Sequence, residues 1–178
     1  GLGSVYSLTA DGEVAADGMN RTARRIVALA KSLALPLYPT VSDYNNAYGD
    51  GGGFDPGVSQ AVLATPATRA HAVDSLVRLV TDGGHAGLNI DLEAVQPADT
   101  ARYTLFMQAL AQALHAQGLT LVASVPPKTG DHRPRALDGY DYGALGAAAD
   151  WLQVMTYDEV GPGWASSGFN GEAWPGPE

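Results

Sequence analysis

Three polar side chains alternate with apolar ones in residues 87–93, Gly-Leu-Asn-Ile-Asp-Leu-Glu. Asn89, Asp91 and Glu93 stand at every second position, so in a β-strand they would share one face. Two carboxyl groups on one face are residue types that suit general acid–base chemistry. The same alternation is typical of a surface strand whose polar side faces water. Taken alone, the two carboxyl groups could also cap a helix or bind a divalent metal ion.

The segments on either side of residues 87–93 favour a functional site. A helix-like pattern of apolar residues precedes them and ends at Gly83-Gly84, and another helix-like segment opens at residues 96–99. A strand between two helices is typical of a βαβ unit, whose parallel sheet is covered on both faces. Carboxyl groups at the carboxyl end of such a strand are costly to bury unless they serve a site.

The rest of the chain also alternates between expected strands and expected helices. Apolar runs predict strands over residues 4–8, 35–41, 87–93, 119–125 and 151–157, and helical spacing predicts helices over residues 21–33, 65–83, 98–117 and 142–149. The clearest helix signal is Thr65-Pro66, a capping residue followed by proline at the first helical position. This alternation predicts an α/β fold, and polar residues at the carboxyl ends of the strands favour a (β/α)8 barrel over an open sheet.

The length of the chain limits how much of a barrel it can form. A complete barrel of eight units takes about 250 residues, whereas this sequence has 178 and five expected strands. We therefore expect a barrel that is present only in part. Because an unclosed barrel has two exposed edges, the remainder of the barrel is an expected partner.

Composition excludes several other functions. The sequence has 10 basic and 19 acidic residues, a net charge of −9, which argues against nucleic acid or an anionic membrane as partner. It has no cysteine, which excludes disulfides and thiolate metal sites. The four histidines are scattered along the sequence, so neither a metal centre nor a catalytic triad is predicted, and no cofactor is expected. No apolar run approaches the roughly 20 residues that membrane insertion requires.

Two segments resemble motifs of glycoside hydrolase family 18. Residues 87–93 are similar to the DxxDxDxE strand of that family, and residues 155–158, Met-Thr-Tyr-Asp, are similar to its MxYD strand. Two motifs in the same order are more specific than either one alone. Residues 6–12, 123–128 and 140–142 extend the likeness to the branch of spore-germination and cortex-lytic N-acetylglucosaminidases. The resemblance implies that residues 1–178 are part of a catalytic barrel and span about strands 2 to 6.

The sequence departs from the family pattern at two positions. Ala86 and Asn89 stand where the pattern has aspartates. The first of these aspartates looks mainly structural, so its loss concerns stability more than chemistry. Asn89 removes a carboxylate that would share a proton with Asp91, although the acid Glu93 is kept.

The resemblance implies a chemistry for these residues. Family 18 enzymes cleave β-1,4-linked N-acetylglucosamine polymers with retention, and the 2-acetamido oxygen of the substrate is the nucleophile. Glu93 would be the acid and later the base, and Asp91 would raise the pKa of Glu93 and hold the acetamido N–H. Tyr157 would donate to the acetamido carbonyl, although a tyrosine on an apolar strand is ordinarily a core residue. The expected substrate-binding residues are Asn89, Asp158 and Met155, together with Asp43 and Asn45 in the polar loop after residues 35–41.

The alternatives left open concern activity and substrate. A non-catalytic, lectin-like barrel that binds carbohydrate ranks second, because such members typically lose the acid that Glu93 supplies here. Peptidoglycan and chitin are not separated by the residues named above, since both contain β-1,4-linked N-acetylglucosamine. For a protein that acts on either polymer, a secreted or cell-envelope location is expected.

Overall fold

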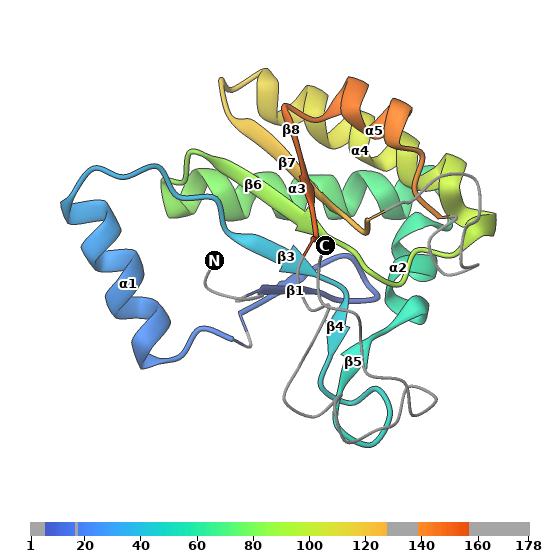
Figure 1. The fold of residues 1–178 in the computed structure, drawn as a ribbon, viewed down its shortest axis with the longest axis horizontal. Helices are drawn as coiled ribbons and strands as arrows, with labels where there is room; N and C mark the ends of the chain where they lie inside the picture. Colours follow the sequence, from blue (N-terminus) through green and yellow to red (C-terminus); the bar gives the residue numbers. More distant parts are fainter. Residues whose placement is uncertain (1–5, 17, 128–138, 157–178) are drawn as a thin grey trace, which may run out of the picture.

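Five parallel strands in chain order make up most of the sheet in the computed structural model, which describes residues 6–16, 18–127 and 139–156 (Figure 1). The parallel strands are β1 (Tyr6–Leu8), β3 (Thr40–Ser42), β6 (Gly87–Asp91), β7 (Thr120–Val125) and β8 (Trp151–Val154). Each of them pairs with the next along the chain, whereas an open doubly wound sheet reverses its strand order. A strand is therefore present in or next to each of the five predicted segments, and the strand order is that of a barrel.

Two aromatic rings show that the sheet is curved. Tyr38, just before β3, and Trp151, the first residue of β8, meet edge to face with ring centroids 5.7 Å apart. Because β6 and β7 lie between β3 and β8, these strands would be about 14 Å apart in a flat sheet. Side chains converge only on a concave face. The sheet is therefore an arc of a (β/α)8 barrel, as predicted.

The helices follow the strands in the order that a barrel requires. They are α1 (Arg21–Ser32), α2 (Pro56–Leu63), α3 (Pro66–Gly83), α4 (Thr100–His115) and α5 (Tyr142–Ala148), and the 3₁₀ turn η1 (Pro97–Asp99) leads into α4. The contacts of α3 with β6, α4 with β7 and α5 with β8 place these helices on one face of the sheet (Figure 1). In the part of the chain that the structure describes, none of the helices has the length and apolar character to span a membrane.

Capping residues set the ends of α1 and α3. The Asn20 side chain accepts the Ala23 N–H at 3.0 Å and begins α1. Thr65 begins α3 in the same way, ahead of Pro66. At the other end of α3, Gly84 adopts a left-handed conformation with φ of +60°, which glycine tolerates without a steric penalty.

The hydrophobic core lies between the sheet and the helices. It contains Leu88 and Ile90 of β6, which are fully buried with residues of α3 and α4. Because side chains alternate across a strand, these two residues direct Asn89 and Asp91 to the concave face. The packing of β6 against its helices thus decides which face carries the polar groups.

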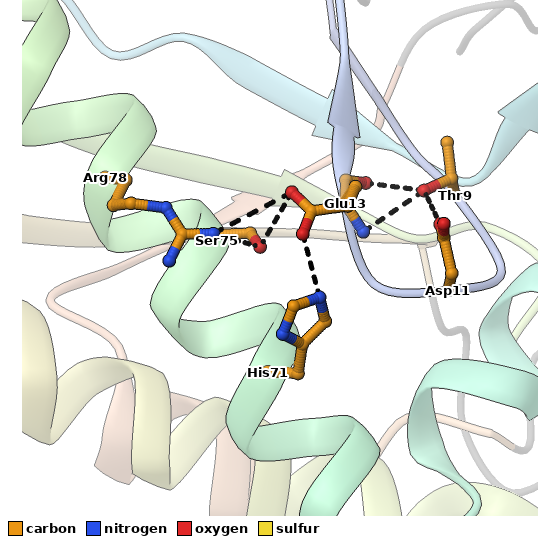
Figure 2. A network of polar contacts seen from close by, with 6 residues as sticks. All are labelled: Thr9, Asp11, Glu13, His71, Ser75 and Arg78. Atoms are coloured by element: carbon orange, nitrogen blue, oxygen red, sulfur yellow. Dashed lines mark hydrogen bonds and ion pairs between the residues drawn. The ribbon is translucent and has the colours of Figure 1, made fainter.

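A polar network ties the β1–β2 turn to helix α3 (Figure 2). Oε1 of Glu13 lies 2.8 Å from His71 Nε2, and Glu13 Oε2 accepts from Ser75 Oγ at 3.3 Å. On the other side of the turn, Thr9 Oγ1 donates to the Glu13 carbonyl at 2.9 Å. These contacts anchor β2 (Val14–Ala15), which runs antiparallel to β1 at the edge of the sheet.

The expected strand over residues 35–41 is only partly correct. The strand β3 is confined to Thr40–Ser42, although the carbonyls of Leu37 and Pro39 still accept the N–H groups of Ala86 and Asn89, each at 2.9 Å. Pro36 and Pro39 lack an N–H and cannot donate in return. In the segment before β3, carbonyl groups therefore accept hydrogen bonds from the neighbouring chain, while the two prolines donate none.

Four short elements lie outside the sequence prediction. They are β2, the hairpin of β4 (Tyr44–Asn45) and β5 (Gly53–Phe54), and helix α2. Strands of two residues and a helix of eight are too short for a clear periodic signal. The β4–β5 hairpin projects beyond the carboxyl end of β3 (Figure 1).

Candidate active site

The strand register gathers polar side chains in one layer of the concave face. Ser7 pairs with Ser42, Ser42 with Asp91, and Ser124 with Gln153. Asp91 and Ser124 stand one position beyond the Ile90–Ala123 pair, so they are also level. Because level residues of parallel strands share a face, Asp91 lies within a row of hydroxyl and amide groups at the carboxyl ends of the strands.

Asn89 links three strands one layer below Asp91. Its Nδ2 lies 3.2 Å from Thr40 Oγ1 of β3 and 3.1 Å from Ser124 Oγ of β7. The Ser124 hydroxyl is also 3.2 Å from Asn89 Oδ1 and can donate to it. The Asn89 side chain is buried, with 6% of its surface exposed. It therefore lies one layer beneath Asp91, and its contact with a substrate stays a prediction.

Asp91 has a carboxyl oxygen available for a ligand. Among the described residues, Oδ1 of Asp91 is buried and has no hydrogen-bond partner. Burial raises the pKa of Asp91, a hydrogen bond from Ser124 opposes that shift, and the charge of Asp43 adds to it. A buried acceptor without a donor costs free energy, and an N–H group of a bound molecule would remove that cost.

Glu93 lies just beyond the end of β6, with its side chain exposed. Its backbone N–H donates to Asp43 Oδ1 at 3.0 Å, and the next N–H, of Ala94, donates to Asp43 Oδ2 at 3.0 Å. From the other side, Tyr140 Oη donates to the Leu92 carbonyl at 2.8 Å. The loop that carries Glu93 is therefore held from both sides, while the carboxyl group itself reaches the surface.

The structure corrects the prediction that Asp43 binds the substrate. Asp43 is fully buried, with 0% exposed, and its carboxylate accepts from Glu93 N, Ala94 N and, at 2.6 Å, Ser59 Oγ. A side chain without exposed surface cannot touch a bound sugar. Asp43 instead lies under the loop that carries Glu93.

Asn45 is bonded within the β4–β5 hairpin. Its Nδ2 donates to Asp55 Oδ2 at 2.8 Å, and its Oδ1 accepts the Ala47 N–H at 2.9 Å. The side chain is half-buried. A contact between Asn45 and a sugar remains a prediction.

The second motif is only partly described. Met155 follows β8, is half-buried and donates its N–H to the Val125 carbonyl at 3.0 Å. Tyr157 and Asp158 lie outside the described residues, so their expected roles remain predictions. Across the described ranges, no group of three or more histidine, aspartate or glutamate side chains could hold a metal ion.

Two residues of the candidate site were missed by sequence reasoning. Ser124 bonds to Asn89 and Asp91, and Tyr140 holds the loop at Leu92. Burial, followed by the charge of Asp43, raises the pKa of the Tyr140 hydroxyl, which keeps this donor protonated. Ser124 is a small polar residue inside an apolar strand, and this was the available signal. Its partner is set by the register, which the sequence pattern leaves open.

Comparisons with known proteins agree with this geometry. Residues 48–173 match the model of Glycosyl hydrolases family 18. A class V chitinase from Pseudomonas fluorescens Pf-5 superimposes with a TM-score of 0.86 and 53% identity, over 99% of this chain and 51% of that one. YvbX, an uncharacterized glycosylase of Bacillus subtilis (strain 168), is 36% identical over 133 residues, which are 74% of this chain and 38% of YvbX.

A cortical fragment-lytic enzyme of Bacillus anthracis is 25% identical over 110 residues, which are 61% of this chain and 25% of that enzyme. The chain thus spans about half of the chitinase and less of the two Bacillus proteins. The family match covers well over half of the chain and includes the strand that carries Asp91 and Glu93. The chain therefore belongs to glycosyl hydrolases family 18.

Proposed function

We propose that the protein containing this chain is a glycoside hydrolase that cleaves β-1,4-linked N-acetylglucosamine polymers. The arrangement that carries this proposal is Asp91, with a buried oxygen that has no hydrogen-bond partner among the described residues, two residues before the exposed Glu93 at the carboxyl end of β6. Active sites of (β/α)8 barrels lie at this end of the strands. Family membership and the likeness to a class V chitinase support the same reaction class.

The proposed reaction is substrate-assisted. The acetamido carbonyl oxygen attacks the anomeric carbon while the bond from that carbon to the leaving oxygen breaks, and Glu93 gives its proton to the leaving oxygen. Water then attacks the same carbon and gives its proton to Glu93, which returns to the acid form. Two displacements at one carbon leave the product in the β configuration.

Asp91 has the role of orienting the acetamido group. Its Oδ1 can accept the acetamido N–H, which turns the carbonyl oxygen of that group toward the anomeric carbon. Holding the attacking oxygen close to the anomeric carbon accounts for a large part of the rate acceleration of such a reaction over the uncatalysed one. The raised pKa of Asp91 shows that burial disfavours its charged form. A hydrogen bond from the N–H group of a substrate would stabilise that charged form.

Asn89 changes the electrostatics of the site relative to the family pattern. An amide cannot share a proton with Asp91, and here it is bonded to Thr40 and Ser124. Burial raises the pKa of Asp91, and the charge that adds to this shift comes from Asp43, the residue after β3. This chain therefore couples Asp91 to a carboxylate at a different position.

The residues after β8 complete the proposed site. Tyr157 donates to the acetamido carbonyl oxygen and holds it in place for attack on the anomeric carbon, and Asp158 binds the sugar. Met155 and Asn89 line the floor. Substitution of Tyr157 by phenylalanine should lower kcat by about 10-fold to 10³-fold, the scale of one lost donor.

The remainder of the barrel is the proposed partner within the protein. Leu29 of α1 and Leu33, the residue after this helix, are each 60% exposed, and Trp151 of β8 is 56% exposed. β2 and β8 are the outer strands of the sheet. Further strands and helices of a barrel would cover these apolar side chains and pair with an edge.

The substrate class has two candidates, chitin and peptidoglycan. The chitinase relative favours chitin, and the cortical fragment-lytic relative favours peptidoglycan. Both polymers contain the acetamido sugar that the mechanism requires. Action on either polymer places the protein outside the cell membrane or in the cell envelope, which is our proposed location.

The experiment that tests this function uses the full-length protein and its Glu93→Gln variant. Glutamine keeps the shape of the side chain and has no transferable carboxyl proton, so the variant should bind chitooligosaccharides or peptidoglycan fragments while kcat falls by about 10² to 10⁴-fold. NMR of the first product should show the β anomer. Unchanged turnover in Glu93→Gln would favour a carbohydrate-binding barrel or another acid, and an α product would exclude the substrate-assisted route.

A further inference from the structure

The carboxylate of Asp43 continues the pairing between β3 and β6 beyond the last strand residues. The ladder ends at the Ser42–Asp91 pair. Past that pair, the N–H groups of Glu93 and Ala94 donate to the two carboxyl oxygens of Asp43, each at 3.0 Å. A side chain of one strand thus fixes two further backbone positions of its neighbour.

The chain around Asp43 is folded so as to hold this carboxylate in place. Ser59 of α2 donates to Asp43 Oδ2 at 2.6 Å, and the Asp43 carbonyl accepts the Asp55 N–H at 3.0 Å. Asp55 in turn begins α2 by accepting the Gly57 N–H at 2.8 Å. The β4–β5 hairpin and α2 therefore return the chain to Asp43.

A fully buried carboxylate is a costly way to hold a loop. Burial raises the pKa of Asp43, and its three hydrogen bonds oppose that shift only in part. A neutral acceptor would hold one of the N–H groups with a smaller desolvation cost. The presence of a carboxylate therefore favours a role in the reaction beyond stability.

The opposite side of the same loop is also constrained. Tyr140 Oη donates to the Leu92 carbonyl at 2.8 Å. A Cβ atom at Gly139 would lie 2.2 Å from the Val95 carbonyl oxygen, so this close approach requires glycine. The position from which the Glu93 side chain starts is set by the backbone that these contacts hold.

We propose that Asp43 is a positioning residue: by holding the N–H groups of Glu93 and Ala94, it sets the direction in which Glu93 presents its carboxyl group to a bound sugar. This inference rests on the proposed function, in which Glu93 is the acid and base. Asp43 itself is buried and does not touch the substrate. Its loss therefore acts on kcat through Glu93 and leaves KM nearly unchanged.

The charge of Asp43 has a second consequence that a purely structural residue would lack. Within the described ranges, the ionisable groups whose charges interact with Asp43 and Asp91 are the phenols Tyr103 of α4 and Tyr140 before α5, and Glu93 interacts with Tyr140. Removing the Asp43 charge should lower the pKa of Asp91. The acid limb of kcat/KM should then move to lower pH.

The test compares Asp43→Asn and Asp43→Ala with wild type in the full-length protein. Asparagine keeps one acceptor oxygen and loses the other, so one backbone bond is lost. We expect kcat of Asp43→Asn to fall by about 10²-fold, the scale of a displacement of about 1 Å in a reacting group. KM should stay within about threefold, and Asp43→Ala should lose more. Circular dichroism and Tm report whether each variant is folded.

Asp150→Asn is the matched control. Asp150 Oδ2 also accepts a backbone N–H, that of Leu121 at 2.8 Å, together with His115 Nε2 at 2.8 Å. It lies at the amino end of β7, away from Glu93. Its loss should lower Tm without changing kcat or the pH profile.

The outcomes separate this inference from the proposed function. If Glu93→Gln is inactive while Asp43→Asn keeps the kcat and pH profile of wild type, the positioning role is wrong and the function stands. If the wild-type protein cleaves none of these polymers, both fall. If neither Asp43 variant folds, Ser59→Ala tests the positioning role instead, because it removes one hydrogen bond that holds Asp43. Its kcat should fall by about 3-fold to 10-fold. An unchanged kcat would contradict the proposal.

Discussion

Asn89 and Ser124 are bonded to each other across β6 and β7, with Nδ2 and Oδ1 of the amide 3.1 and 3.2 Å from the same hydroxyl oxygen. The hydroxyl also bonds to Asp91 and lowers its pKa, against the larger effect of burial. The residue that replaces a family aspartate is therefore joined to the proposed orienting carboxylate through one serine.

Asn89→Asp should restore a carboxylate beside Asp91. The hydroxyls of Thr40 and Ser124 can turn to donate to it, so we expect the variant to fold. A like charge on the same face raises the pKa of Asp91 further. The acid limb of kcat/KM should therefore move to higher pH. Asn89→Ala removes the amide without adding charge, so it should lower Tm and leave the acid limb of kcat/KM unchanged. The same acid limb in wild type and Asn89→Asp would contradict an interaction between the charges at positions 89 and 91.

The raised pKa of Asp91 should also make the free energy of unfolding depend on pH. Its folded pKa lies above the unfolded value of 3.8, so folding favours the protonated form. The resulting penalty is absent below pH 3.8 and grows as pH rises toward the folded pKa. Asp91→Asn removes the penalty.

Chemical unfolding of wild type and Asp91→Asn, each measured from pH 3.5 to about pH 7, checks this sign. The stability of the variant relative to wild type should increase with pH across that range. A constant difference would show that Asp91 has the same pKa in the folded and unfolded protein.

The fold could be predicted from the sequence, because it depends on local periodicity, and the same periodicity is the basis on which Asp91 and Glu93 are proposed as site residues. Alternation over residues 87–93 directs Asp91 and Glu93 to one face, and the strand order of the structure agrees with a barrel. The role of Asp43 could not be predicted in this way. It depends on the register of β3 against β6 and on a hairpin that returns Ser59 to the same carboxylate, and no local pattern contains either contact.

Two neighbouring tyrosines should respond in opposite ways to the loss of a hydroxyl group. Tyr103 and Tyr140 meet edge to face with ring centroids 5.9 Å apart. Tyr140 Oη donates to the Leu92 carbonyl, whereas Tyr103 Oη is buried with no partner among the described residues. Tyr140→Phe should therefore cost about 1–3 kcal/mol of unfolding free energy, and Tyr103→Phe should cost nothing or stabilise the protein slightly.

Urea unfolding of the two variants in the full-length protein measures this difference. Tyr140→Phe should also lower kcat, because the loop that carries Glu93 is then held on one side only, and Tyr103→Phe should not. Equal losses of stability in the two variants would show that the Tyr140 hydrogen bond contributes little.

The last prediction concerns the 178 residues expressed alone. Apolar side chains at the end of α1 and in β8 are exposed, with Leu29 and Leu33 each 60% and Trp151 56% accessible, and in the described part of the chain β2 and β8 form the edges of the sheet. Exposed edges and apolar patches promote association. We therefore expect this chain to unfold at a lower temperature than the full-length protein, to self-associate, and to cleave no polymer. Light scattering and calorimetry of both proteins test this. A monomer that unfolds cooperatively and hydrolyses the sugar would show that the arc formed by β1 to β8 suffices for both folding and catalysis, and that the exposed leucines at the end of α1 require no partner.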